Sequence, residues 1–214
     1  SRPGSGGGGG GGSLAQLDNL YSFEFDGVGS YMDLGADVLF DSTAGFSTSA
    51  WVYLDSYSTP YPIAVRVKTD QATDFICIGL SDQTNYKGVI FGSSSNFLTG
   101  RTTGDISGDF IGTWKHVCLT YDGVDRTNLS SYKIYVDGSE VALVSAGIFG
   151  AFTSQNNLIG YSETASNSFN GKIDEVGIFN VALTGAEVLS IYNATTTGKT
   201  GDLNTLSTPP VAWY

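Results

Sequence analysis

Long apolar runs, positive charge, cysteine and histidine are all scarce in this chain of 214 residues. No run approaches the roughly 18 apolar residues that a membrane-spanning helix needs, so we expect no membrane insertion. Ten Lys and Arg stand against 21 Asp and Glu, which gives a net charge of −11. Nucleic acids and anionic membranes bind cationic surfaces, so neither is an expected partner. No basic start followed by an apolar segment is present, so no signal peptide is predicted in this sequence.

Two cysteines and one histidine are the only residues that could support thiol or imidazole chemistry. Cys77 and Cys118 each lie in an apolar, strand-like run and outside any CxxC motif. We interpret both as buried free thiols, and a disulfide between them stays open because spacing does not define a pairing. The single histidine, His116, shares a strand face with Cys118, two positions away. A core imidazole is the simpler interpretation there, and a Cys–His nucleophile is the alternative.

Glycine and aromatic residues are abundant by contrast, with 29 glycines and 13% aromatic residues but only 14% charged residues. This balance favours short strands joined by tight turns over amphipathic helices. Strand-like segments occur at short intervals: 21–27, 30–35, 46–54, 62–68, 74–80, 88–92, 113–123, 132–144, 156–161 and the start of 169–192. So many short strands and glycine turns predict an all-β sandwich closed on itself.

Two local motifs give finer predictions. Asp137 and Gly138 can supply the positive φ angles of a type I′ turn, so a hairpin is expected around them. Thr184 and Glu187 have the spacing of a capping box, in which each side chain accepts a backbone N–H at the start of a helix. One short helix is therefore predicted at 185–193.

The chain divides into three parts. Residues 1–13 include seven consecutive glycines, which cannot offset their ordering entropy, and we predict a flexible tether over 1–19. The folded domain is expected to span 20–193. Residues 194–214 are polar and rich in turn residues, and we interpret them as a tail. The apolar ending, VAWY, favours truncation from a longer protein, with a docked C-terminus as the alternative.

Several segments occur in an order that is typical of one family: FEFDGVGSYMDLG, FSTSAWVYL, GTWKHVCLTYDG, YKIYVDG, NLIGY and FNGKIDEVGIFNVALTGAEVLSIY. Over roughly 20–193 the chain resembles laminin-G-like domains of the concanavalin A-like lectin/glucanase superfamily. The resemblance implies a jelly-roll sandwich of two antiparallel sheets with one short C-terminal helix. It also implies a module of a large extracellular or virion-surface protein, such as a phage structural protein. The same fold carries lectins, adhesion modules, glycosidases and lyases, so it does not define the function.

Two carboxylates, Asp174 and Glu175, stand side by side in the apolar run at 169–192. Neighbouring side chains of a regular strand point to opposite faces, so this pair is not expected to flank one glycosidic bond. Glu24 and Asp26 have the i, i+2 spacing of glycosidases in this superfamily but lack a third acid. We therefore expect no enzyme activity, and we interpret Glu175 as a solvent-facing or surface-paired residue.

A structural Ca²⁺ ion is implied by the resemblance, because the first and last strands of related domains often lie together. The ligands would be Asp26 and Asp174, with a backbone carbonyl such as that of Gly27. Ca²⁺ takes about six to eight oxygen ligands, including carboxylates and carbonyls, so the chemistry fits. In the alternative, Asp26 caps an Asp-Gly turn and Asp174 accepts hydrogen bonds from backbone amides.

A sugar site would combine an aromatic face with hydrogen-bonding side chains at its edge. Trp51 and Trp114 lie in apolar strand runs, and we interpret them as core residues. The candidate ligand contacts lie in polar loops or among apolar neighbours: Tyr57, Tyr61, Arg66, Tyr86 and Arg101. Because each is a single residue of an ordinary type, this prediction depends on the exposure expected of loops rather than on a motif.

These observations lead to two main hypotheses. The first is a noncatalytic carbohydrate-binding or adhesion module of an extracellular or virion-surface protein. Its ligand would be a glycan or cell-surface polysaccharide, and other domains of a longer parent protein would adjoin it. The second is a structural or decoration module without a sugar ligand, which a flat apolar patch would favour. A hydrolase or lyase is a third hypothesis, which requires two carboxylates on one face, or a His–Tyr–Arg constellation, in a cleft.

Overall fold

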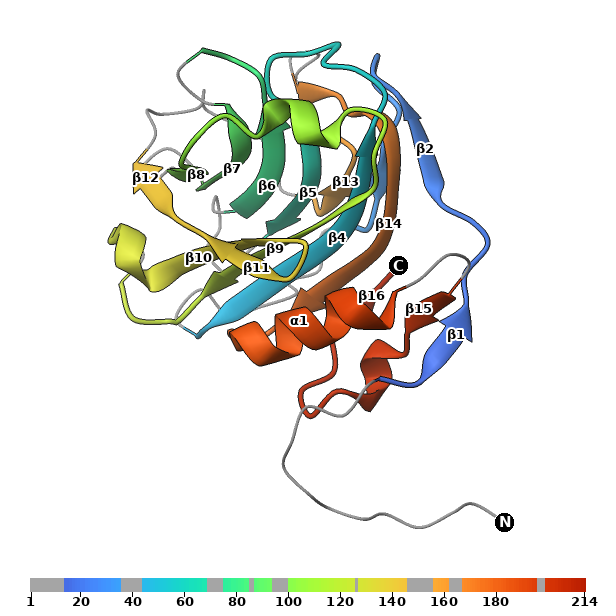
Figure 1. Ribbon diagram of the computed structural model, residues 1–214, viewed down its shortest axis with the longest axis vertical. Helices are drawn as coiled ribbons and strands as arrows, with labels where there is room; N and C mark the ends of the chain where they lie inside the picture. The colour runs from blue at the N-terminus through green and yellow to red at the C-terminus, as the bar shows by residue number, and fades with distance from the viewer. Residues whose placement is uncertain are drawn as a thin grey trace.

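The computed structural model describes residues 14–35, 44–68, 75–84, 87–93, 100–125, 127–145, 156–161, 167–195 and 199–214. Within these ranges the protein is a sandwich of two antiparallel sheets (Figure 1). The first sheet consists, in spatial order, of β11 (Ser139–Val141), β10 (Tyr132–Val136), β9 (Lys115–Tyr121), β4 (Phe46–Leu54), β14 (Asn170–Phe179) and β16 (Ala212–Trp213), and β2 (Phe23–Asp26) also pairs with β14. The second sheet consists of β12 (Leu143–Ser145), β8 (Gly100–Thr102), β7 (Gly88–Ser93), β6 (Phe75–Ser81), β5 (Ile63–Lys68), β13 (Leu158–Ile159) and β3 (Met32–Asp33).

The core lies between the two sheets and follows the alternation of their strands. In β4, the inward side chains Ala50, Val52 and Leu54 belong to the main buried cluster. The residues between them, Trp51 and Tyr53, point to the opposite, outer face of the first sheet. Buried aliphatic and aromatic residues of the second sheet complete this cluster from the other side. The predicted all-β jelly-roll sandwich is therefore confirmed.

A single α-helix in the described residues, α1 (Gly185–Ala194), covers part of the outer face of the first sheet. Figure 1 shows it crossing beside β4 and β14. Val188 and Ile191 of the helix pack with buried Cys118 and Tyr135 in a second apolar cluster. The helix thus buries apolar surface that the sheet would otherwise expose to water.

Both local motifs form as predicted. Thr184 Oγ1 accepts the backbone N–H of Glu187 at 3.3 Å, and the Glu187 carboxylate accepts the backbone N–H of Thr184 at 2.8 Å. This capping box begins α1. Asp137 and Gly138 have φ angles of 49° and 75° and join β10 to β11 as the expected hairpin. Short 3-10 helices complete the described structure: η1 (Ser107–Phe110), η2 (Leu129–Ser131) and η4 (Leu203–Thr205).

The folded unit extends on both sides of residues 20–193. The strand β1 (Gln16–Asp18) pairs antiparallel with β15 (Lys199–Gly201), and β16 adds to the edge of β14. Segments assigned to the tether and the tail therefore pack together beside α1 (Figure 1). The glycine tract at 1–13 lies outside the described residues.

The cysteines and the histidine are structural. Cys77 and Cys118 are both buried and free, which confirms their interpretation as unpaired thiols. They lie in different sheets, in β6 and β9. His116 is only 1% exposed, and burial lowers its pKa to about 4, so the imidazole is neutral at physiological pH. Within the described part of the chain, no helix has the length and apolarity to cross a membrane.

Candidate functional site

Strand β14 contains a β-bulge at its two neighbouring carboxylates. Asp174 pairs with Trp51 of β4, whereas the next paired residue of β14, Gly177, faces Ser49. Two residues of β14 therefore lie opposite one residue of β4, which defines a bulge. Glu175 has a φ of 52°, a left-handed conformation that is uncommon for any residue other than glycine.

The bulge brings both carboxylates to the outer face of the first sheet. Ile173 and Val176 both belong to the main core cluster although they are three residues apart, a spacing that regular alternation does not allow. Asp174 and Glu175, between them, point away from the core. The prediction that these two side chains lie on opposite faces is wrong, because it assumed a regular strand.

One amide side chain binds both carboxylates. Asn19 Nδ2 donates to Asp174 Oδ2 at 2.9 Å and to Glu175 Oε1 at 2.8 Å. The backbone N–H of Glu175 donates to Asp174 Oδ1 at 2.9 Å. Trp213 Nε1 donates to Glu175 Oε2 at 2.7 Å. Each of the four carboxylate oxygens therefore accepts a hydrogen bond from the protein, and these bonds fix the orientation of the pair.

The pair forms part of the wall of a pocket with a volume of about 560 Å³. The pocket is lined by Asn19, Leu20, Tyr21, Ser22, Trp51, Trp114, Asp174, Glu175, Thr195 and Lys199. By sequence position these residues belong to the connection between β1 and β2, to β4 and β14, to the residue before β9, to the C-cap of α1 and to the start of β15. A cavity of this volume suits a small ligand or one or two units of a polymer.

Aromatic side chains form the apolar part of the pocket. Trp114 is 36% exposed, and its ring centroid lies 5.6 Å from that of Tyr53. Trp51 stacks on Tyr192 of α1 with ring centroids 5.7 Å apart. Tyr21 is 86% exposed at the rim of the pocket. The interpretation of Trp51 and Trp114 as core residues is wrong, because neither side chain lies between the two sheets.

Burial raises the pKa of both carboxyl groups. Loss of water is the largest cause for Asp174 and for Glu175, and the charge of Asp174 raises the pKa of Glu175 further. Hydrogen bonds from Asn19 and Trp213 act in the opposite direction, because they stabilise the charged forms. The pocket therefore presents two partly desolvated carboxylates beside aromatic rings.

The predicted calcium ligands do not come together. Asp26 pairs with Asn170 at the start of β14, and Asp174 lies four residues further along that strand. At the usual rise per residue this separates the backbone positions of the two residues by about 13 Å along the strand, more than two Asp side chains can span. Calcium–oxygen bonds are about 2.3–2.6 Å long, so one ion cannot bridge this pair. Calcium binding at another place on the chain stays a prediction of the family resemblance.

Asp26 instead caps the turn that follows β2. Its Oδ1 accepts the backbone N–H groups of residues 28–30 at 2.9, 3.2 and 3.1 Å, and these bonds lower its pKa to about 2. Gly27 has a φ of 73°, and a Cβ at this position would lie 2.7 Å from the Cβ of Asn170. The turn therefore requires glycine here. In the ranges that the structure describes, no group of three or more His, Cys, Asp and Glu side chains could hold a metal ion.

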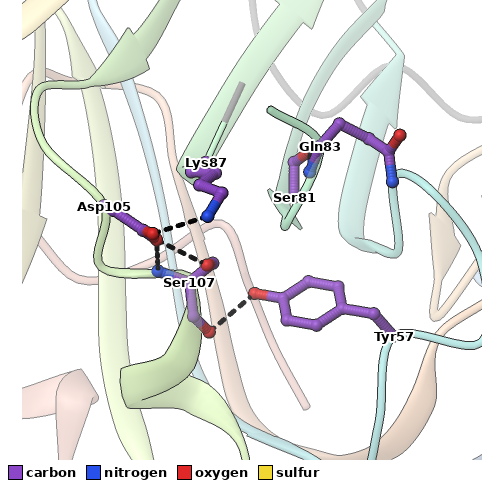
Figure 2. Close-up of polar contacts among 6 residues, drawn as sticks. All are labelled: Tyr57, Ser81, Gln83, Lys87, Asp105 and Ser107. Atoms are coloured by element: carbon purple, nitrogen blue, oxygen red, sulfur yellow. Dashed lines mark hydrogen bonds and ion pairs between the residues drawn. The ribbon is translucent and has the colours of Figure 1, made fainter. Parts of the chain in front are cut away.

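Tyr57, a predicted ligand contact, lies away from the pocket. Its hydroxyl donates to the backbone carbonyl of Ser107 at 2.9 Å, as Figure 2 shows. In the same loop region, Asp105 accepts hydrogen bonds from Lys87 and from the Ser107 hydroxyl, each at 2.7 Å. Burial raises the pKa of Tyr57. These contacts favour a role for Tyr57 in holding the loops at this end of the sandwich.

The other predicted ligand contacts in the described residues belong to the second sheet or lie beside it. Arg66 pairs with Cys77 and is 0% exposed, so a ligand cannot reach it and the predicted role is wrong. Tyr61 packs against a small buried cluster that includes Cys77. Arg101 Nη1 donates to the carbonyl of the next residue at 3.0 Å. None of the three lines the pocket at the bulge. Tyr86 lies outside the described residues.

Sequence reasoning missed several residues of the pocket because they lie outside the expected domain. Asn19 falls in the predicted tether and Lys199 in the predicted tail. Trp213, which does not line the pocket but donates to Glu175, also falls in the predicted tail. One signal of the bulge is present in the sequence: Ile173 and Val176 are separated by two acids, which fits neither strand alternation nor a solvent-facing turn. That spacing indicates a break in the alternation, whereas the pairing of β14 with β4 places the two carboxylates on one face.

Solved structures share this fold. Domain 4 of AbnA, a GH43 extracellular arabinanase from Geobacillus stearothermophilus, in complex with arabinotriose, matches with a TM-score of 0.55 and 22% identity, over 83% of this chain and 80% of that one. A heptameric SAP-like pentraxin from Limulus polyphemus matches with a TM-score of 0.51 and 16% identity, over 84% of each chain. At these identities the likeness concerns the fold. No match was found among curated proteins.

The family follows from the sequence match together with the fold. A family model described as the concanavalin A-like lectin/glucanases superfamily, of the laminin-G type, matches residues 26–189. These residues run from the end of β2 into α1 and include most strands of both sheets. The chain therefore belongs to the concanavalin A-like lectin/glucanases superfamily, as its resemblance to laminin-G-like domains predicted.

Proposed function

We propose that the protein is a noncatalytic carbohydrate-binding module and that its sugar site is the pocket at the bulge of β14. The observation that carries this proposal is the joint presence of aromatic faces and polar side chains around one cavity. Aromatic rings pack against the C–H-rich face of a sugar, while amides and carboxylates bind its hydroxyls. The arabinanase domain that shares the fold was solved with arabinotriose, which supports a sugar ligand for this chain.

A noncatalytic role is supported by how the two carboxylates are held. Glycosidase carboxyls flank the scissile bond, and one of them must donate a proton to the leaving oxygen. Asp174 and Glu175 are adjacent on one strand, so they approach a ligand from the same side. Their four oxygens already accept hydrogen bonds from the protein, which fixes both groups in this one-sided arrangement. The pair therefore suits the binding of a ligand's donor groups better than acid catalysis.

The setting that we propose is extracellular. The arabinanase domain belongs to an extracellular enzyme, and a module of this kind would adjoin other domains of a longer protein on a cell or virion surface. Its ligand would then be a glycan or a cell-surface polysaccharide.

Titration of glycans tests the proposed function. We would measure binding of arabino-, gluco-, galacto- and hexosamine oligosaccharides by isothermal titration calorimetry to the wild type, Trp114→Ala and Tyr31→Ala. Trp114 lines the pocket, whereas Tyr31 is an exposed aromatic residue stacked on Tyr161 elsewhere. We expect Trp114→Ala to weaken binding about tenfold or more and Tyr31→Ala to leave it unchanged. Absence of binding by the wild type to every glycan would contradict the proposal.

A second candidate, an assembly module without a sugar ligand, is supported by exposed apolar residues near β2. Leu17, Leu20, Phe23 and Val28 are all exposed, and β2 lies at an edge of the first sheet. Exposed apolar side chains on an edge strand favour docking of another chain. Analytical ultracentrifugation of the wild type and of Phe23→Ser would test this candidate, which predicts self-association that the substitution reduces.

A further inference from the structure

Asp174 and Glu175 take part in none of the ion pairs of the described residues. The ion pairs within the described residues involve other carboxylates, namely Asp18, Asp105, Asp137 and Glu140. Lys199 lines the pocket, but its ammonium pairs with Asp18. Asp174 and Glu175 receive hydrogen bonds only from an amide, an indole, a hydroxyl and the backbone. No ion pair in the described part of the chain therefore compensates the negative charge of this pair.

Two carboxylates in this arrangement destabilise the folded protein, and a bound cation would remove that effect. Two neighbouring carboxylates that have lost part of their water repel one another, and burial raises the pKa of both. A carboxylate offers about four acceptor positions, so each of the two groups still has room for a further donor. A ligand cation between the two groups would remove their repulsion and fill these positions.

The aromatic part of the pocket suits the same kind of ligand. Trp51 and Trp114 line the pocket together with the two carboxylates, and Tyr21 lies at its rim. The face of an aromatic ring attracts a cation and also packs against the apolar face of a sugar. The net charge of −11 adds a long-range attraction for cations and a repulsion for anions.

We propose that the pocket selects a glycan unit with a free amino group, a de-N-acetylated hexosamine, whose ammonium binds between Asp174 and Glu175 while its ring packs against Trp114. The inference rests on the proposed function and adds the substrate class. It also explains the placement of two acids on one face by a bulge, since a regular strand would present only one of them. Uronic and sulfated glycans are excluded by the same charges, because an anionic group would meet the carboxylate pair.

The test compares two tetrasaccharides that differ only in N-acetylation. Binding of the glucosamine tetramer, the N-acetylglucosamine tetramer and a galacturonic acid tetramer would be measured by calorimetry at pH 6 and low salt. We expect the glucosamine tetramer to bind at least about tenfold more tightly than its N-acetylated form, and the acid tetramer not to bind. Added salt should weaken the glucosamine interaction selectively, because an ion pair with a half-exposed group is screened.

Variants test whether the carboxylate pair causes the preference for the free amine over the N-acetylated glycan. Asp174→Asn and Glu175→Gln keep the side-chain shape and remove one charge each, and we expect each to reduce the preference for the free amine about threefold to tenfold. Asp109→Asn removes one exposed charge outside the pocket and should leave the preference unchanged. Thermal melts establish that each variant is folded. The comparison of wild-type affinities keeps the proposal testable even if a pocket variant fails to fold.

The outcomes separate this inference from the proposed function. Equal or tighter binding of the N-acetylated tetramer, still lost in Trp114→Ala, would overturn the amino-sugar preference and leave the carbohydrate-binding module in place. Tighter binding of the galacturonic acid tetramer would overturn it in the same way. Binding of only the neutral arabino-, gluco- or galacto-oligosaccharides would overturn the inference alone. If none of these and none of the three tetramers binds the wild type, both the inference and the proposed function are contradicted.

Discussion

At the scale of single residues, the carboxyl groups of this protein fall into two groups with opposite effects on stability. Asp26 is exposed and accepts several hydrogen bonds, so its pKa is lowered to about 2. Asp174 and Glu175 are partly buried next to one another, so their pKa values are raised. A lowered carboxyl pKa stabilises the folded state at neutral pH, whereas a raised one destabilises it. The first pattern is typical of a structural cap and the second of a binding site.

We predict that Asp174→Asn raises the free energy of unfolding at pH 7. The folded-state pKa of Asp174 lies above the unfolded value, so the ionised group opposes folding, and this effect disappears as the pH falls below both values. Because the group is partly exposed, we expect a gain on the order of 0.5 kcal/mol after screening. Urea unfolding of both proteins at pH 7 and pH 3.5 measures the change. A variant that is less stable at pH 7 would contradict the prediction.

We predict that Asp26→Ala lowers the melting temperature by the same amount in calcium and in EDTA. The side chain holds the backbone of residues 28–30, and this role does not involve a metal ion. The loss should be present at neutral pH and vanish as the pH falls through about 2, where the wild-type carboxyl also becomes protonated. Differential scanning calorimetry with each additive measures it. A calcium-dependent shift in the wild type that the substitution removes would restore Asp26 as a calcium ligand.

At the scale of elements, one irregularity in β14 decides what the first sheet presents. Asp174 and Glu175 reach the outer face because two residues of β14 lie opposite one residue of β4. The strand then resumes its alternation with Val176 in the core. A bulge of this kind bends the strand and redirects a side chain, which is why bulges occur beside binding sites.

We predict that Glu175→Gly is more stable than Glu175→Val, which is the reverse of the order in a regular strand. In a regular strand, valine is more favourable than glycine. At a φ of 52°, glycine is relaxed and a β-branched side chain is strained, so Glu175→Gly should be more stable than Glu175→Val by about 1–2 kcal/mol. Chemical denaturation of the two variants measures the difference. The usual strand order, with valine more stable, would show that this position is a regular strand residue.

At the scale of the whole molecule, the site depends on both ends of the described chain. Asn19 follows β1, Lys199 begins β15 and Trp213 lies in β16, while the two carboxylates lie in β14, next to the edge strands of the first sheet. Pairing of β1 with β15 and of β16 with β14 brings these segments to one pocket. Bringing segments that are so distant in sequence together costs conformational entropy, which packing on the outer face must offset.

We predict that Trp213→Phe weakens ligand binding severalfold while the fold is retained. Phenylalanine keeps most of the ring contacts but cannot donate a hydrogen bond to Glu175. Loss of a hydrogen bond to a charged, half-buried acceptor costs about 1 kcal/mol and frees the carboxylate to turn. Calorimetric titration with the tightest glycan measures the change. Lys133→Met, which removes an exposed ion pair with Glu140 outside the pocket, is the matched control and should not alter binding.

The sequence predicted the parts of the fold that depend on local chemistry. The β-forming residues around Trp51 placed β4 at its observed bounds, the capping box of Thr184 and Glu187 placed α1, and the Asp137-Gly138 pair placed the hairpin. These signals succeed because the deciding interactions lie within a few residues of one another. The prediction of ligand-contact residues was less accurate. The burial of Arg66 and the contact of Tyr57 with Ser107 depend on elements that are distant in sequence.

The sequence by itself determined the fold class, the family and the acidic character of this protein, because alternation, turn residues and net charge are properties of the chain. Tertiary structure alone decided where a ligand can bind. The bulge arises from how β14 pairs with β4, and the pocket arises where the segment after β1, the sheet and the C-terminal strands meet. Register and docking of distant segments minimise the free energy of the whole molecule, so no short stretch of sequence contains that information.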